Sequence, residues 1–296
     1  TFICCLKACS SIQAMSKGRE MHSEIERLGY LERDPEVGNV LIDMYVKCGL
    51  LEKAQEVFDR LSDRSIVSWT SLITGYIEHE LAEEAIECFE QMQLDGIAPD
   101  AMTFLAGLKA CGSMGAISKG EEMHIEIERR GLLEQDIVCG KALVDMYAKC
   151  SCLDKAQQVF SRLPIRDVVA WTTLMAGYAQ LGESVNVFCV YNKMLEDGVK
   201  PDEVVFAITL GACGQLGLLQ KHETYFEVMS KGIVSIHKLF TCIVHFFSSI
   251  GQLDNAFEMI KKMPCCPTPK MWNNLLGASR YSGNLVVGRH AFEHAT

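Results

Sequence analysis

The sequence repeats itself at a shift of 102 residues. The string SIQAMSKGREMH at 11–22 returns as SMGAISKGEEMH at 113–124, LIDMYVKCG at 41–49 returns as LVDMYAKCS at 143–151, and Trp69 returns as Trp171. A fixed period of this kind is the signature of a solenoid, in which each repeat buries its apolar face only against its neighbours. The chain is therefore expected to work through an extended surface.

The 102-residue period is composite, because it divides into repeats of 36, 31 and 35 residues. Thr1 occupies the third position of its repeat, so we expect further sequence upstream. The repeat boundaries are 1–34, 35–65, 66–100, 101–136, 137–167, 168–202, 203–236 and 237–268, followed by a partial motif at 269–296.

Each repeat reads as two helices joined by a short turn. In the repeat 168–202, apolar residues recur at helical spacing in VVAWTTLMAGYAQ, and ESVNVFCVYNKMLED follows a Leu181-Gly182 turn. Gly198 suits the left-handed position that ends a helix, and Pro201 prevents its continuation; Gly131 marks the same point in another repeat. No segment shows the two-residue alternation of a strand over a useful length. The sequence predicts an all-α fold, a right-handed solenoid (superhelix) of about eight stacked helix pairs.

Composition narrows the possible functions. Hydrophobic residues make up 49% of the chain, yet no run of about 18 uncharged apolar residues exists to span a membrane. The net charge of −10 counts against nonspecific binding of nucleic acid, which needs a basic surplus. Lys47 and Lys149 share the thirteenth position of the 31-residue repeat, and Lys7 and Lys109 share the ninth position of the 36-residue repeat. Such lysines are either solvated helix charges or phosphate contacts.

The fourteen cysteines suggest a metal or disulfide framework until they are placed in register. Cys9, Cys111 and Cys213 share one position, and Cys48 and Cys150 share another, both near the end of a first helix, where a small residue packs well. No C-x-x-C occurs, so we predict no metal site and no cofactor. So many unpaired thiols indicate a reducing compartment.

The pattern H-x-E occurs at 22–24 and again at 124–126. Zinc nucleobase deaminases pair this pattern with P-C-x-x-C, which is absent from this chain. A catalytic motif is not expected once in each period, so we predict that the chain is not itself an enzyme.

Several strings resemble the plant pentatricopeptide repeat family: the repeat endings GIAPD and GVKPD, ALVDMYAKCSCLDKAQQVFSRLP, WTTLMAGYAQLGE and the final MWNNLLGASRYSGNLVVGRHAFEHA. The alternating lengths look like the PLS subclass, which has triplets of long, short and ordinary repeats. The resemblance covers nearly the whole chain, and 269–296 is similar to the start of the extension motif that follows the last repeat in such proteins.

This resemblance implies binding of single-stranded RNA at about one nucleotide per repeat. The PLS subclass mostly specifies sites of C-to-U editing in chloroplasts or mitochondria. A deaminase would come from C-terminal sequence or act in trans from another chain, and proteins of the multiple organellar RNA editing factor type are implied as helpers.

In this family the fifth and last residues of a repeat read the base. The resemblance implies guanine for Thr70 with Asp100 and for Thr172 with Asp202, and it implies cytosine for Asn39 with Ser65. The remaining pairs are Leu105 with Asp136, Lys141 with Asp167, Ala207 with Ile236, and Thr241 with Thr268; Leu105, Lys141 and Ala207 depart from the usual code. The second-position residues Val67, Val138 and Val169 would pack against base faces, whereas Glu36 replaces the apolar residue there.

Two alternatives remain open on the sequence. Asp100, Asp136, Asp167, Asp202 and Ser65 are all good N-caps, worth about 1 kcal/mol each, and capping alone is able to place them. Thr is a poor helix former, which favours base contact at the exposed fifth positions. A protein-binding scaffold without base preference is the alternative function, and uncovered ends of the array would favour end-to-end or swapped dimers.

Overall fold

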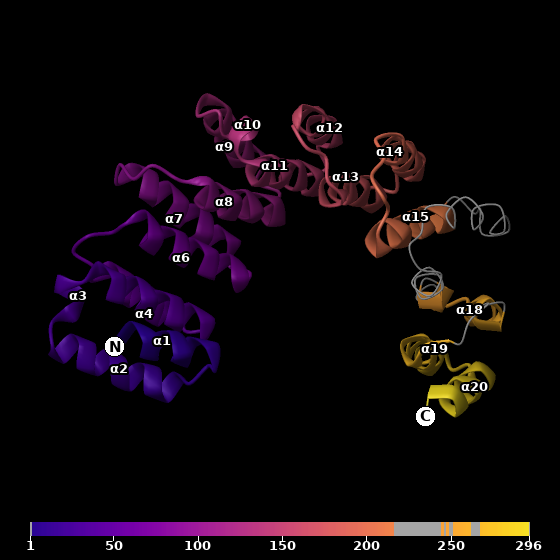
Figure 1. The fold of residues 1–296 in the computed structure, drawn as a ribbon, viewed down its shortest axis with the longest axis horizontal. Coiled ribbons are helices and arrows are strands. Elements are labelled where there is room, and N and C mark those ends of the chain that lie inside the picture. Colours follow the sequence, from indigo (N-terminus) through magenta and orange to yellow (C-terminus); the bar gives the residue numbers. More distant parts are fainter. Residues whose placement is uncertain (1, 216–243, 246, 249–250, 262–266, 296) are drawn as a thin grey trace. The chain divides into compact units, whose positions relative to one another are not determined.

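The computed structural model describes residues 2–215, 244–245, 247–248, 251–261 and 267–295, and these residues form helices without a strand (Figure 1). They divide into two compact units, Thr1–Ile165 and Arg166–Thr296. The described part contains no helix long and apolar enough to cross a membrane. The predicted all-α class is confirmed.

The N-terminal unit is a stack of helix pairs. Each first helix packs against its second helix and against the first helices of neighbouring repeats, which is the arrangement of a solenoid. The first helices are α1 (Phe2–Ser11), α4 (Pro35–Lys47), α6 (Ile66–Glu78), α8 (Ala101–Met114) and α11 (Ile137–Lys149); the second helices are α2 (Met15–Arg27), α5 (Leu51–Asp59), α7 (Ala82–Leu94), α9 (Ile117–Arg129) and α12 (Leu153–Arg162).

The C-terminal unit contains α13 (Val168–Gln180), α14 (Ser184–Glu196), α15 (Glu203–Gln215), α18 (Leu253–Lys261), α19 (Pro269–Ser282) and α20 (Leu285–Ala295). Helix α13 packs on α14 and α15, and α19 packs on α18 and α20. Phe206, Phe247, Trp272 and Leu275 belong to one buried apolar cluster of this unit. The expected base-reading residues Ile236 and Thr241 lie outside the described residues.

Two of the long repeats, 1–34 and 101–136, contain a third, short helix that the sequence analysis did not foresee. Helices α3 (Tyr30–Arg33) and α10 (Leu132–Gln135) follow Gly29 and Gly131, whose φ angles are 67° and 66°. Glycine adopts this left-handed conformation without steric cost. The chain then makes one more helical turn and buries Leu31 or Leu133 before the next repeat begins.

Close packing between long and short repeats explains the recurrent glycine of SKGREMH and SKGEEMH. A Cβ atom added at Gly120 of α9 would lie 2.5 Å from Sδ of Met146 in α11, and one added at Gly18 of α2 would lie 2.7 Å from Sδ of Met44 in α4. Both methionines are fully buried. A side chain at either position would overlap the buried methionine, so the close packing favours glycine there.

Candidate nucleic-acid interface

Where the structure describes it, the last residue of an expected repeat is the N-cap of the next first helix. Oδ1 of Asp100 accepts a hydrogen bond from the backbone N–H of Thr103 at 2.8 Å, and Oδ1 of Asp202 accepts from Val204 and Val205 at 3.1 and 3.0 Å. Ser65, Asp136 and Asp167 cap their helices in the same way. The capping role is confirmed, and in Asp100 and Asp202 it engages one of the two carboxylate oxygens.

The fifth and last residues of the repeat 66–100 are joined through a third side chain. The hydroxyl oxygen of Thr70 lies 2.9 Å from that of Thr103, and the Thr103 hydroxyl donates to Oδ1 of Asp100 at 2.7 Å. Thr103 is fully buried. Thr70 is half-buried rather than exposed as the sequence suggested, and its hydroxyl also lies 2.8 Å from the carbonyl of Ile66. Sequence reasoning missed Thr103; a threonine at the third, core-facing position was the available signal.

The repeat 35–65 joins its fifth and last residues directly. Nδ2 of Asn39 donates to Oγ of Ser65 at 3.4 Å, a long hydrogen bond. In the repeat 168–202, the hydroxyl of Thr172 donates to the carbonyl of Val168, and Val205 stands where Thr103 stands one period earlier. The structure therefore brings the paired residues together in the repeats 35–65 and 66–100, and the repeat 168–202 lacks the bridging hydroxyl.

An apolar side chain lies exposed at the second position of successive repeats. Val67 and Val169 are 58% and 55% exposed, and Val138 is 39% exposed. Met102 and Val204 occupy the same position, are 56% and 54% exposed, and were missed by the sequence analysis. Each of these side chains is two residues from an N-cap. Solvated apolar side chains of this kind, each close to the N-cap of its helix, are suited to contact the faces of bases.

The remaining expected base-reading residues differ in their exposure and in their hydrogen bonds. Leu105 and Lys141 are half-buried, and Ala207 is exposed. Thr268 is the N-cap residue of α19, but its side chain makes no capping hydrogen bond.

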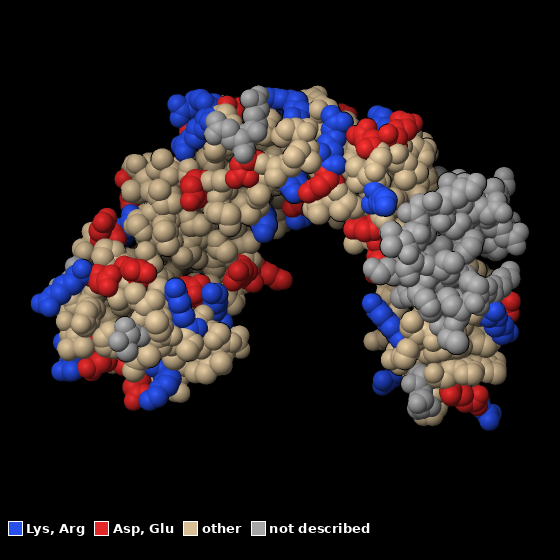
Figure 2. Space-filling view, in the orientation of Figure 1, with Lys and Arg blue, Asp and Glu red and all other residues tan. Residues whose placement is uncertain are grey.

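The two lysines expected to contact phosphate have partners on their own helices. Nζ of Lys47 lies 2.8 Å from the Asp43 carboxylate, and Nζ of Lys149 lies 2.8 Å from that of Asp145. All four residues are at least one-third exposed, so these ion pairs are worth little in water. A phosphate is able to compete for such lysines. On the visible face, basic and acidic side chains lie interspersed (Figure 2).

The H-x-E histidines join long repeats to short ones. Nδ1 of His22 lies 2.8 Å from the Tyr45 hydroxyl, and Nδ1 of His124 lies 2.9 Å from that of Tyr147. Burial lowers the pKa of both histidines. The glutamate of the second motif, Glu126, binds Arg129 and Arg130, which lower its pKa to about 2. In the part of the chain that is described, no three His, Cys, Asp or Glu side chains gather to hold a metal ion.

The chain resembles plant proteins with the same repeats. Two proteins of Arabidopsis thaliana described as putative pentatricopeptide repeat-containing proteins are 36% and 34% identical to it, over 97% and 99% of this chain. A third Arabidopsis pentatricopeptide repeat-containing protein, described as mitochondrial, is 33% identical. The chain spans 39%, 58% and 45% of the lengths of these three relatives.

A solved structure shares the fold. The crystal structure of the pentatricopeptide repeat protein PPR10 in complex with an 18-nt psaJ RNA element matches 94% of this chain and 42% of that chain, with a TM-score of 0.64 and 16% identity. The crystal structure of the pentatricopeptide repeat protein PPR10 from maize matches 99% of this chain and 48% of that chain, with a TM-score of 0.61 and 15% identity. The model for the PPR repeat family matches residues 64–113 and 166–215. The model for the PPR repeat matches residues 39–66, 141–168 and 239–266. These matches together span more than half of the sequence, and the chain belongs to the pentatricopeptide repeat family.

Proposed function

We propose that this chain binds single-stranded RNA in a sequence-specific manner, at about one base per repeat, through the fifth and last residues. The observation that carries the proposal is the convergence of Thr70, Thr103 and Asp100, with hydroxyl and carboxylate oxygens 2.9 and 2.7 Å apart. The shared fold with PPR10, whose crystal structure contains an RNA element, supports it.

The chemistry of these groups suits base edges. A carboxylate accepts hydrogen bonds from the N1 and N2 donors of guanine or from N3 of uracil. The family's code assigns the pairs Thr70/Asp100 and Thr172/Asp202 to guanine. Asn39 and Ser65 are assigned to cytosine by the family's code. The exposed side chains at the second positions, Met102 and Val204 included, would contact base faces.

The finer role that we propose is the specification of C-to-U editing sites in a chloroplast or mitochondrion. The alternation of long, short and ordinary repeats supports assignment to the PLS subclass, and one relative is described as mitochondrial. The chain would position a deaminase supplied by another segment or protein, with editing factors as helpers.

A protein-binding scaffold is the second candidate. The net charge of −10 and the pairing of Lys47 and Lys149 with carboxylates favour it, because both reduce attraction to phosphate. A scaffold of this kind would show no preference among bases, which separates the two functions.

The substitution Thr172→Asn tests the RNA code. It keeps a small polar side chain and leaves the Asp202 cap in place, and by the family's code it should move preference at one nucleotide from guanine to uracil. We expect a change in discrimination of roughly 1–3 kcal/mol, the value of a good base-edge contact. Competition binding with RNAs that differ only at that nucleotide measures it.

Thr173→Asn is the matched control, because Thr173 neighbours Thr172 on α13 but is not a code position; its hydroxyl donates to the carbonyl of Val169 at 2.8 Å. It should leave the base preference unchanged. Equal loss of affinity for all four bases in Thr172→Asn, or no loss for any, would show that position 172 is structural and does not read RNA.

A further inference from the structure

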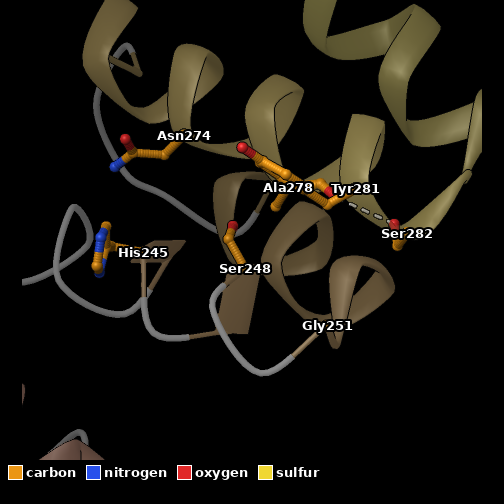
Figure 3. A pocket seen from close by; sticks show the side chains of 7 residues that line it. All are labelled: His245, Ser248, Gly251, Asn274, Ala278, Tyr281 and Ser282. Carbon is orange, nitrogen blue, oxygen red and sulfur yellow. Dashed lines mark hydrogen bonds between the residues drawn. The ribbon is translucent and has the colours of Figure 1, made fainter.

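A hollow of about 470 Å³ lies in the C-terminal unit, between α19 and the residues His245, Ser248 and Gly251 (Figure 3). Asn274, Ala278, Tyr281 and Ser282 line it from α19, and His245 and Ser248 line it from the other side. In this view the His245 and Tyr281 rings lie on opposite sides of the hollow, with the Ser248 hydroxyl between them. The volume is within the range of small-molecule sites.

Two features of this hollow are unusual for a protein surface. Ser248 is 7% exposed, and its Oγ has no hydrogen-bond partner among the described residues. Buried hydroxyls almost always have a partner, so an unpaired one at the wall of a hollow is available to bond to a ligand atom. Tyr281 is 95% exposed, although aromatic rings normally gain from burial.

The repeat register shows how the packing differs at this place. In the pair α4 and α6, Val46 is the twelfth residue of a short repeat and Gly75 is the tenth residue of the next, and a Cβ atom added at Gly75 would lie 2.6 Å from Cγ2 of Val46. In the C-terminal unit the same two positions hold Ser248 and Ala278. The smaller, polar Ser248 therefore stands where a valine fills the earlier interface.

The lining selects for a flat, uncharged ligand with hydrogen-bonding edges. The lining residues include no Lys, Arg, Asp or Glu in the part of the chain that is described, so no acidic or permanently basic side chain there favours a charged ligand. The Ser248 hydroxyl and the Asn274 amide each donate and accept hydrogen bonds. An exposed tyrosine ring at the rim provides a stacking surface.

We propose that this hollow receives one nucleobase of the bound RNA, next to the bases read by the repeats. The inference rests on the RNA binding proposed above. The base would stack on Tyr281, and its edge would bond to the Ser248 hydroxyl and the Asn274 amide. The C-terminal motif would thereby add one position to the recognised sequence.

The test is a selection from a random-sequence pool of single-stranded RNA, carried out with the full chain and three variants. Tyr281→Ala removes the stacking ring. Ala278→Met fills the hollow with a larger side chain at the tenth position of the motif, where the short repeats have Met44 and Met146. Phe292→Ala is the matched control, because Phe292 is another exposed ring of the same unit, at 60%, and is not among the lining residues described.

The parent chain and Phe292→Ala should enrich a sequence with one preferred base beyond the repeat-read stretch. Tyr281→Ala and Ala278→Met should lose that base alone, with affinity for the full sequence lowered roughly 5- to 100-fold, as expected for one base-stacking contact. The same enriched sequence from all four proteins would overturn the inference and leave the repeat-based function standing. A parent chain that enriches no sequence would overturn the proposed function and this inference with it.

Discussion

The hydroxyl oxygens of Thr70 and Thr103 lie 2.9 Å apart, although the two residues belong to successive repeats. Thr103 donates to Asp100, which is also its helix cap, so one buried hydroxyl links the fifth residue of a repeat to its last residue. Such a link would hold both groups in place before the proposed RNA binds. Fixing binding groups in advance reduces the entropy lost on association.

Removing this link should weaken both the fold and the reading of one base. Thr103→Val keeps the shape of the side chain and removes its hydroxyl, so we expect the free energy of unfolding to fall by about 1 kcal/mol. Discrimination for guanine at the position of Thr70 should also fall. Urea unfolding and competition binding measure the two effects.

The opposite change, which introduces a hydroxyl, can be made at Val205, at the position equivalent to Thr103. Val205→Thr places a hydroxyl beside Asp202 in the repeat 168–202, where the native chain has none, and it should strengthen guanine preference there. If Thr103→Val changed stability without changing base preference, the link would be part of the fold alone.

Stability should depend on pH through two half-buried histidines, His22 and His124. Burial lowers the pKa values of His22 and His124 in the folded chain. The unfolded chain takes up these protons below its ordinary histidine pKa of about 6.5, whereas the folded chain resists them. The free energy of unfolding is therefore highest above about pH 7 and falls as the pH drops towards about pH 5.

The double variant His22→Asn with His124→Asn should flatten this pH dependence. Asparagine keeps a polar group near the Tyr45 and Tyr147 hydroxyls but does not titrate. Urea unfolding across the same pH window measures the difference. An unchanged slope in the double variant would assign the pH dependence to other groups.

Gly75 of α6 should not tolerate alanine. A Cβ atom there would lie 2.6 Å from Cγ2 of Val46 in α4, so we expect Gly75→Ala to destabilise the chain by about 1–3 kcal/mol despite alanine's better helix propensity. Adding Val46→Ala should relieve the overlap, and the double-mutant cycle should show a favourable coupling.

Gly277 of α19 is the matched control for Gly75. It also lies inside a helix, but an added Cβ atom would meet nothing within 4 Å. Gly277→Ala should therefore stabilise the chain by about 1 kcal/mol. Thermal unfolding of the three variants tests these signs, and a neutral Gly75→Ala would mean that the two helices have room to separate.

The salt dependence of RNA binding should reveal whether Lys149 contacts phosphate. Each phosphate contact on a single strand adds about 0.7 to the slope of log affinity against log salt concentration. Lys149→Ala should lower the slope by this amount. Lys155→Ala is the control, because Lys155 lies on the second helix α12 and pairs with Glu121. Equal slopes for both variants and the parent would leave Lys149 as a helix charge paired with Asp145.

The sequence predicted the fold well because the helix caps and the glycines are local signals, and because the 102-residue repeat is visible in the sequence itself. Gly131 was correctly placed at the end of a helix, but the short helix α10 after it depends on the burial of Leu133, which a single repeat does not reveal. The pairing of Asn39 with Ser65 follows from the repeat register. The bridge through Thr103 does not, because it depends on how closely α6 approaches α8.

The short repeat 35–65 carries different contacts on its two sides. Towards the repeat before it, Met44 fills the space over Gly18; towards the repeat after it, Val46 fills the space over Gly75. A short repeat is therefore matched to a long repeat on one side and to an ordinary repeat on the other. Exchanging single repeats to retarget such a chain would place large side chains against each other or leave empty space. We therefore expect that exchanging a complete triplet preserves these contacts.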